Sequence, residues 1–250
     1  MDSIATNVGV LDKSVTILAA LAERGPLSLA GLVDATGLSR PTAHRLAAAL
    51  EAHRLVGRDG AGRYRLGLRV LAWAGAVSAE FGLAEAARPV LEALRDETGE
   101  SAQLFVRDGD SRLCVAASER PSGLRDTVPV GAVLPIDRGS GGKVLLAYSA
   151  GVAGGDGAAL RGAASRLGGA DLAELETIRR RGWAASVAER EEGVCSVSAP
   201  VLDSAGRIHA ALGISGPINR LGRQPGRHLS APVVAAAREL ERRAGLVGAG

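Results

Sequence analysis

The chain has 250 residues, of which 46% are hydrophobic, and its net charge is only +3. This length suits one large domain or two smaller ones, and the apolar content allows a buried core. Apolar runs of membrane-span length and signal-peptide features are both missing, so we expect a cytoplasmic protein without a membrane partner. Cys114 and Cys195 are far apart, which favours two reduced core thiols over a disulfide or a metal site. The few aromatic residues argue against a single-strand or RNA binder.

The first segment has the pattern of three short helices. Apolar residues at helical spacing predict a helix over residues 11–23, and Gly25-Pro26 should end it. Ser28 is expected to cap a second helix that stops at a left-handed Gly37. Ser39 is expected to cap a third helix, in which Pro41 costs little because amides in the first turn have no helical acceptor.

A predicted β-hairpin follows the third helix. Residues 55–56 and 64–66 have strand patterns on either side of a turn at 59–62. Three helices followed by a hairpin predict a winged helix-turn-helix, whose third helix enters a DNA major groove. The alternative is a small helical domain with a solvated charged face. We expect Arg58 to contact phosphate, and the principal DNA-binding candidates are Ser28, Ser39, Arg40, Thr42, His44, Arg45, Arg63 and Arg65.

The rest of the chain mixes helices and strands. Residues 68–81 predict a linker helix that packs against a copy of itself. Strand hairpins are then expected at 102–117 and 195–215. Helices are expected at 84–98, 140–148, 150–169, 172–181 and 225–243. The pattern predicts an α+β fold with a central antiparallel sheet, divided into a DNA-binding domain at 1–67, a linker helix at 68–82 and a second domain at 83–250.

We find no catalytic residue, metal site or cofactor site in the sequence. The four histidines lack metal-ligand spacing, and the nucleophile-elbow motif is missing. Residues 139–143 resemble the end of a phosphate-binding loop, but Asp137 stands at its first glycine and Val144 at its Ser/Thr position. What remains is a glycine-rich turn that opens a helix. Such a turn can bind an anion or can be a plain helix cap.

Two further segments have small residues at predicted strand ends, at 181–196 and at 213–217. Small residues there leave room for a small ligand, and hydroxyl groups can orient it. Taken singly, each segment also fits ordinary turn chemistry.

Together these segments resemble the isocitrate lyase regulator (IclR) family of bacterial transcription factors. The motifs that carry the resemblance are RYRLG at 63–67, GSGGK at 139–143, RRGWA at 180–184, EGV at 192–194, SAPV at 198–201 and ISGP at 214–217. The resemblance implies a winged helix, a linker helix and a GAF-like effector domain without catalysis, in a homodimer or homotetramer. Segments at 41–47, 99–104 and 122–131 further resemble an actinobacterial subgroup that controls leucine and other amino-acid metabolism.

The resemblance also implies an effector site. Family members that sense small oxoacids surround the carboxylate with a glycine-rich turn, an Asp, a Cys and two Ser. The turn matches at Ser140, Gly141 and Gly142, and one serine matches at Ser215. Ser186, Ser196 and Gly213 stand where the Asp, the Cys and the other Ser would be. These departures predict a different small effector, an amino acid or a metabolic acid such as a branched-chain intermediate.

The sequence therefore predicts a sequence-specific regulator of transcription, either a repressor or an activator, that binds a double-stranded operator and responds to a small molecule. The alternative is a small-molecule-binding protein or enzyme whose helical N-terminal domain does not bind DNA. A protein–protein adaptor built on a winged helix is a third possibility, and strong salt dependence of DNA affinity would argue against it.

Overall fold

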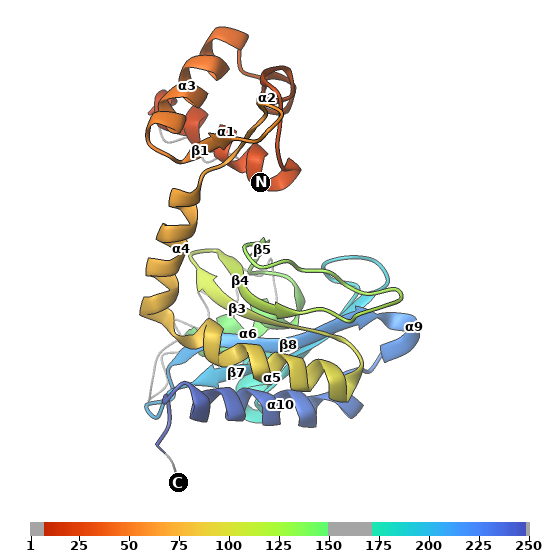
Figure 1. The fold of residues 1–250 in the computed structure, drawn as a ribbon. Coiled ribbons are helices and arrows are strands. Elements are labelled where there is room, and N and C mark those ends of the chain that lie inside the picture. The colour runs from red at the N-terminus through yellow and green to blue at the C-terminus, as the bar shows by residue number, and fades with distance from the viewer. Residues whose placement is uncertain (1–7, 150–171, 249–250) are drawn as a thin grey trace. The chain divides into compact units, whose positions relative to one another are not determined.

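The computed structural model describes residues 8–149 and 172–248 (Figure 1). Its chain divides into two compact units, Met1–Glu80 and Phe81–Gly250. Among the described helices, none combines the length and apolar character needed to cross a membrane. The helix expected at 150–169 lies outside the described residues.

The first unit consists of three helices and a two-stranded hairpin. The helices are α1 (Gly9–Arg24), α2 (Leu29–Thr36) and α3 (Arg40–Ala52). Strands β1 (Val56–Arg58) and β2 (Tyr64–Leu66) pair antiparallel, with Gly57 opposite Arg65. Their apolar faces meet in one core, formed by Ile17, Leu21, Leu32, Leu46, Ala47, Leu50, Val56 and Tyr64.

The helix-turn-helix has the expected caps with one difference. The Ser28 hydroxyl accepts a hydrogen bond from the Gly31 amide at 3.1 Å, and Gly37 ends α2 with a φ of 67°. Ser39 occupies the cap position of α3, but its hydroxyl donates to Thr42 Oγ1 at 2.9 Å instead of accepting from a backbone amide. The expectation of a hydroxyl cap at Ser39 was therefore wrong, because the neighbouring hydroxyl competes for it.

Helix α4 (Leu68–Phe81) begins directly after the hairpin, at the predicted residues. The connection requires a glycine, because a Cβ at Gly67 would collide with the carbonyl group of Arg54. The Gly67 amide donates to the Leu55 carbonyl at 2.9 Å, so the backbone at Gly67 is held close to the backbone at Leu55. Arg69 in the first turn of α4 donates to the His53 carbonyl at 3.2 Å.

The second unit is built on a six-stranded antiparallel sheet of order β5-β4-β3-β8-β7-β6. One half of the sheet comes from β3 (Ser101–Asp108), β4 (Ser111–Ser118) and β5 (Val133–Pro135). The other half comes from β6 (Ala184–Val187), β7 (Val194–Leu202) and β8 (Ile208–Pro217). The two halves join where β3 pairs with β8, with Ala102 opposite Ile214.

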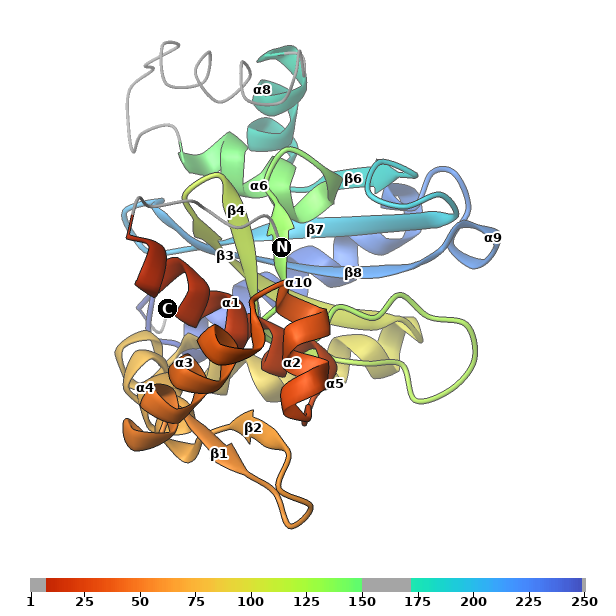
Figure 2. The same cartoon turned by 90° about the horizontal axis from the view of Figure 1, so that it is seen from above.

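Helices cover both faces of this sheet (Figure 2). On one face lie α5 (Leu83–Thr98) and α10 (Gly226–Arg243), and on the other α6 (Gly139–Ser149) and α8 (Leu172–Arg181). Successive strand residues point to opposite faces, so Leu104 and Leu212 join the core under α5 and α10, whereas Phe105 and Ala211 join the core under α6. The short helix α9 (Ile218–Leu221) follows β8.

The predicted α+β architecture is confirmed, with a winged helix-turn-helix and a central antiparallel sheet. Both cysteines are free and buried, as expected. The sequence pattern did not predict β5, β6 or α9. Each has three or four residues, which is too short to show a hydrophobic period.

Candidate nucleic-acid interface and binding cavity

Helix α3 presents one polar face to solvent. Arg40, His44 and Arg45 are exposed and Thr42 is half-buried. The opposite face, with Ala43, Leu46, Ala47 and Leu50, is buried in the core. A helix with this division is anchored by its apolar side, which leaves its polar side free for a groove of DNA.

The three arginines of the hairpin differ in their surroundings. Arg58 donates to Glu51 at 3.2 Å and to the Tyr64 hydroxyl at 2.9 Å, so its guanidinium is engaged within the unit. Arg63 forms an ion pair of 2.8 Å with Asp59 at the hairpin turn, while Arg65 is exposed. Ser28 and Ser39 are exposed at the starts of α2 and α3. Contact of all these residues with DNA stays a prediction.

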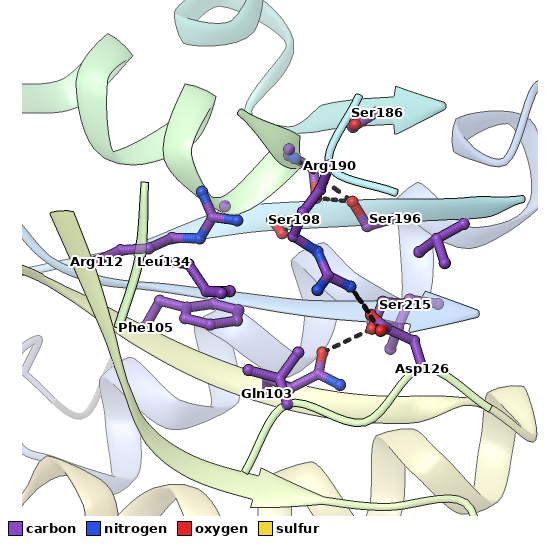
Figure 3. Close-up of a pocket in the computed structure, with 16 residues that line it drawn as sticks. Gln103, Phe105, Arg112, Asp126, Leu134, Ser186, Arg190, Ser196, Ser198 and Ser215 are labelled. Atoms are coloured by element: carbon purple, nitrogen blue, oxygen red, sulfur yellow. Dashed lines mark hydrogen bonds and ion pairs between the residues drawn. The ribbon is translucent and has the colours of Figure 1, made fainter. Parts of the chain in front are cut away.

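The second unit contains a cavity between the start of α6 and the sheet (Figure 3). Five of the seven predicted effector residues line it, namely Ser140, Gly141, Ser186, Ser196 and Ser215. Its free volume is about 30 Å³, room for about two water molecules. Five residues from distant segments therefore meet at one place, around a space that is nearly filled by the protein's own side chains.

Three hydroxyl groups form a connected cluster in the cavity wall. Ser140 Oγ lies 2.8 Å from Ser196 Oγ and 2.8 Å from Ser198 Oγ. Across the cavity, Ser215 Oγ donates to Gln103 Oε1 at 3.2 Å. Hydroxyl groups both donate and accept, so this cluster can orient a polar ligand beside the first turn of α6, where backbone amides lack helical acceptors.

The other two predicted residues, Gly142 and Gly213, do not line the cavity. A Cβ at Gly213 would collide with the Ser198 hydroxyl and lie 2.6 Å from the Val197 carbonyl oxygen. A Cβ at Gly142 would collide with the Ile136 carbonyl. Both glycines permit close packing behind the cavity wall. Gly213 in particular leaves the space that Ser198 fills.

The cavity also contains a buried guanidinium that the sequence analysis missed. Arg112 is 3% exposed, and its Nη1 donates to the carbonyl oxygens of Pro135, at 2.6 Å, and of Arg138. Its Nε has no hydrogen-bond partner among the described residues. Burial, together with the positive charge of Arg190, lowers the pKa of Arg112 to about 10, so this side chain remains charged at neutral pH.

A second missed guanidinium, that of Arg190, is paired inside the cavity. Its Nη2 lies 2.5 Å from both carboxylate oxygens of Asp126, and its Nη1 lies 2.9 Å from Glu191 (Figure 3). The Asp126 side chain is only 5% exposed. The cavity walls thus carry two guanidinium groups, Arg112 and Arg190, and one lining carboxylate, that of Asp126.

Lys143, the last residue of the glycine-rich run, is engaged elsewhere. Its Nζ lies 2.5 Å from Glu189 and 2.9 Å from Glu174. Glu189 also accepts from the Gly139 amide at 3.2 Å, which ties the start of α6 to this carboxylate. A phosphate-binding lysine points at its anion, so these two ion pairs agree with the rejection of a nucleotide site. Among the described residues, no cluster of His, Cys, Asp and Glu is arranged to hold a metal ion.

A winged helix-turn-helix with an exposed polar recognition helix defines the class of DNA-binding transcriptional regulators. Family profiles specify the class further. Residues 10–60 match the IclR helix-turn-helix domain, and residues 75–153 and 170–242 match the C-terminal domain of bacterial IclR transcriptional regulators. The chain belongs to the IclR family of transcriptional regulators.

Similar proteins span nearly the whole chain. The glycerol operon regulatory protein of Streptomyces griseus is 33% identical over 225 residues, covering 87% of this chain and 88% of that protein. Its counterpart in Streptomyces coelicolor is 32% identical and covers 96% of both chains.

Solved structures share the fold. A putative transcriptional regulator from Rhodococcus sp. RHA1 is 25% identical, with a TM-score of 0.73 over 95% of this chain and 98% of that chain. An IclR homologue from Microbacterium hydrocarbonoxydans, solved in complex with 4-hydroxybenzoate, has a TM-score of 0.77 at 20% identity, over 94% of this chain and 99% of that chain.

Proposed function

We propose that this regulator binds a specific operator and that a small acidic molecule in the cavity changes its operator affinity. The observation that supports the proposal is the placement of Arg112 and Arg190 beside the hydroxyl cluster and the first turn of α6. Guanidinium groups and helix N-termini both favour carboxylates, and here they converge in a protected space.

On the DNA side, α3 enters the major groove, and Arg40, Thr42, His44 and Arg45 contact bases or phosphates. Ser28 and Ser39 offer hydroxyls and amides to phosphates, and Arg63 or Arg65 holds the flanking backbone. This assignment is supported by the exposure of the polar face of α3 and of the hairpin.

Two copies pair through the first unit and α4, as a homodimer or within a homotetramer. Leu68, Leu71 and Trp73 are exposed on α4, which suits a helix that packs against its counterpart. The effector changes the geometry of the paired helices, and so the spacing of the recognition helices. Such coupling typically amounts to about 1–3 kcal/mol.

The regulated genes are proposed from resemblance alone. The sequence motifs favour leucine and amino-acid metabolism, whereas the two Streptomyces relatives are named for the glycerol operon. Both sets of upstream DNA belong in the test, together with DNA upstream of the regulator's own gene.

Fluorescence anisotropy of the full-length protein on these duplexes, with unrelated DNA as competitor, tests DNA binding. We expect tight binding that resists the competitor. The same assay with a panel of carboxylic acids and amino acids tests the effector role. Absence of DNA binding even at low salt would overturn the proposal and favour a binding protein or enzyme with a non-DNA-binding helical domain.

A variant of the cavity tests whether an acid bound there changes operator affinity. Arg112→Gln removes the buried positive charge. We expect the affinity for any active acid, measured through its effect on operator binding, to fall at least about tenfold. A loss of this size is expected when one charge-assisted hydrogen bond is removed. Arg107→Gln, on neighbouring β3 but not lining the cavity, is the matched control and should respond like the wild type. An unchanged response in Arg112→Gln would exclude this cavity as the effector site.

A further inference from the structure

The carboxylate of Asp126 lies inside the cavity although its backbone belongs to a long connection. Residues 119–132 join β4 to β5 and form neither helix nor strand. We call this segment the 119–132 loop. Asp126 is 7% exposed, and Figure 3 shows its carboxylate meeting the Arg190 guanidinium across the cavity. The protein therefore places an acidic group of its own where we propose an acidic effector.

Apolar burial contributes little to holding the 119–132 loop in place. Within the loop, Asp126 and Val128 are buried, whereas Leu124 and Val130 are 68% and 62% exposed. A segment with so little buried apolar surface gains little from the hydrophobic effect, so its position depends on polar contacts.

Those polar contacts fix the loop near both ends. The Arg120 amide donates to the Ser101 hydroxyl at 3.1 Å, and the Leu124 carbonyl accepts from Arg220 at 2.9 Å. Farther along, the Gly131 amide donates to the Cys114 carbonyl at 2.8 Å. Between these anchors, the Asp126–Arg190 ion pair joins the middle of the loop to the cavity wall.

The charges in the cavity indicate that an acidic effector must displace a group of the protein. The free space of about 30 Å³ has room for about two water molecules. Arg190 already pairs with the buried Asp126 and the exposed Glu191, and a further carboxylate brought beside it would face the negative charge of Asp126 in a protected site. Exchange of one carboxylate for another keeps Arg190 paired and moves Asp126 toward water.

We propose that Asp126 is a built-in competitor of the effector. An acid group of the ligand replaces the Asp126 carboxylate on Arg190, and the middle of the 119–132 loop leaves the cavity wall. The site thus takes carboxylic acids, and ligand affinity is set partly by the strength of the internal ion pair. This inference rests on the proposed ligand-binding role of the cavity.

Acetate is a simple probe of the exchange. In Asp126→Asn, Arg190 loses its buried carboxylate partner and keeps only the exposed Glu191, so acetate should raise the melting temperature of the full-length variant more than that of the wild type, at ionic strength matched with chloride. Asp96→Asn, an exposed position on α5 outside the cavity, is the control and should behave like the wild type. Adding Arg190→Gln to Asp126→Asn should abolish the acetate effect. Equal acetate responses in Asp126→Asn and the wild type would overturn the proposal.

Free glycine distinguishes another role for Asp126. If this carboxylate instead binds the ammonium group of an amino acid, Asp126→Asn should weaken stabilisation by glycine and leave that by acetate unchanged. That result would overturn the competitor role.

Hydrogen exchange on the wild type keeps the test independent of whether the variant folds. We expect acetate to speed amide exchange in residues 119–132 and to leave α1 to α3 unchanged, whereas an unaffected loop would reject the proposal. If the acetate effects appear but no acid changes operator binding, the regulatory role fails while the Asp126 exchange stands.

Discussion

The Arg45 side chain extends from the exposed face of α3 and has no ion-pair partner within the described residues. An arginine in this position is free to contact a guanine with two hydrogen bonds. We predict that Arg45→Ala weakens operator binding by about 1–3 kcal/mol and leaves the fold unchanged. Anisotropy titrations check this, with Arg24→Ala at the exposed end of α1 as control. Equal affinity of the Arg45→Ala variant and the wild type would contradict the assignment.

Unlike the exposed Arg45, the two cysteines are buried. Burial raises the pKa of Cys114 to about 12 and that of Cys195 to about 11. Because the thiolate is the reactive form, neither side chain should react with a disulfide reagent at neutral pH while the protein is folded. We expect two thiols to react in denaturant and almost none before unfolding. Rapid reaction of the native protein would show that one of them is accessible.

At the level of elements, the close packing of β7 against β8 depends on Gly213. A side chain at position 213 meets Ser198 and the Val197 carbonyl, so we predict that Gly213→Ala destabilises the protein by about 1–3 kcal/mol through overpacking. The urea midpoint measures this effect. Gly57→Ala is a matched strand control, because a Cβ there meets nothing within 4 Å. Combining Gly213→Ala with Ser198→Ala should recover part of the loss, and no recovery would show that the carbonyl contact dominates.

Local signals explain what the sequence predicted. The helices of the first unit and α4 have clear periods, and Ser28 and Gly37 mark the ends of α2 with side-chain and backbone chemistry that acts within a few residues. Four of the cavity serines were predicted because a family pattern placed them, whereas Ser198 was not among the predicted effector residues. Arg112, Asp126 and Arg190 carry no such local signal. Each is an ordinary charged residue in sequence, and their convergence depends on the pairing of β3 with β8.

At the scale of the whole molecule, the apolar residues of α4 bear on assembly. Leu71 is 71% exposed and Leu68 is 72% exposed, three residues apart on one side of the helix. We predict that Leu71→Glu shifts the protein toward the monomer in sedimentation velocity and weakens operator binding, because a charge in a helix pair is costly to bury. Leu124→Glu, which changes an equally exposed leucine of the second unit, is the control. An unaltered sedimentation coefficient would place the contact between subunits elsewhere.

The strand order β5-β4-β3-β8-β7-β6 has a consequence for how the protein is made. The winged helix-turn-helix is complete by residue 66, whereas β8, the partner of β3 in the middle of the sheet, spans Ile208–Pro217. The helix-turn-helix unit can therefore fold long before the second unit can close its sheet, because domains fold as units during synthesis. A message that ends before codon 208 would encode the helix-turn-helix unit without the strand that joins the two halves of the sheet around the cavity.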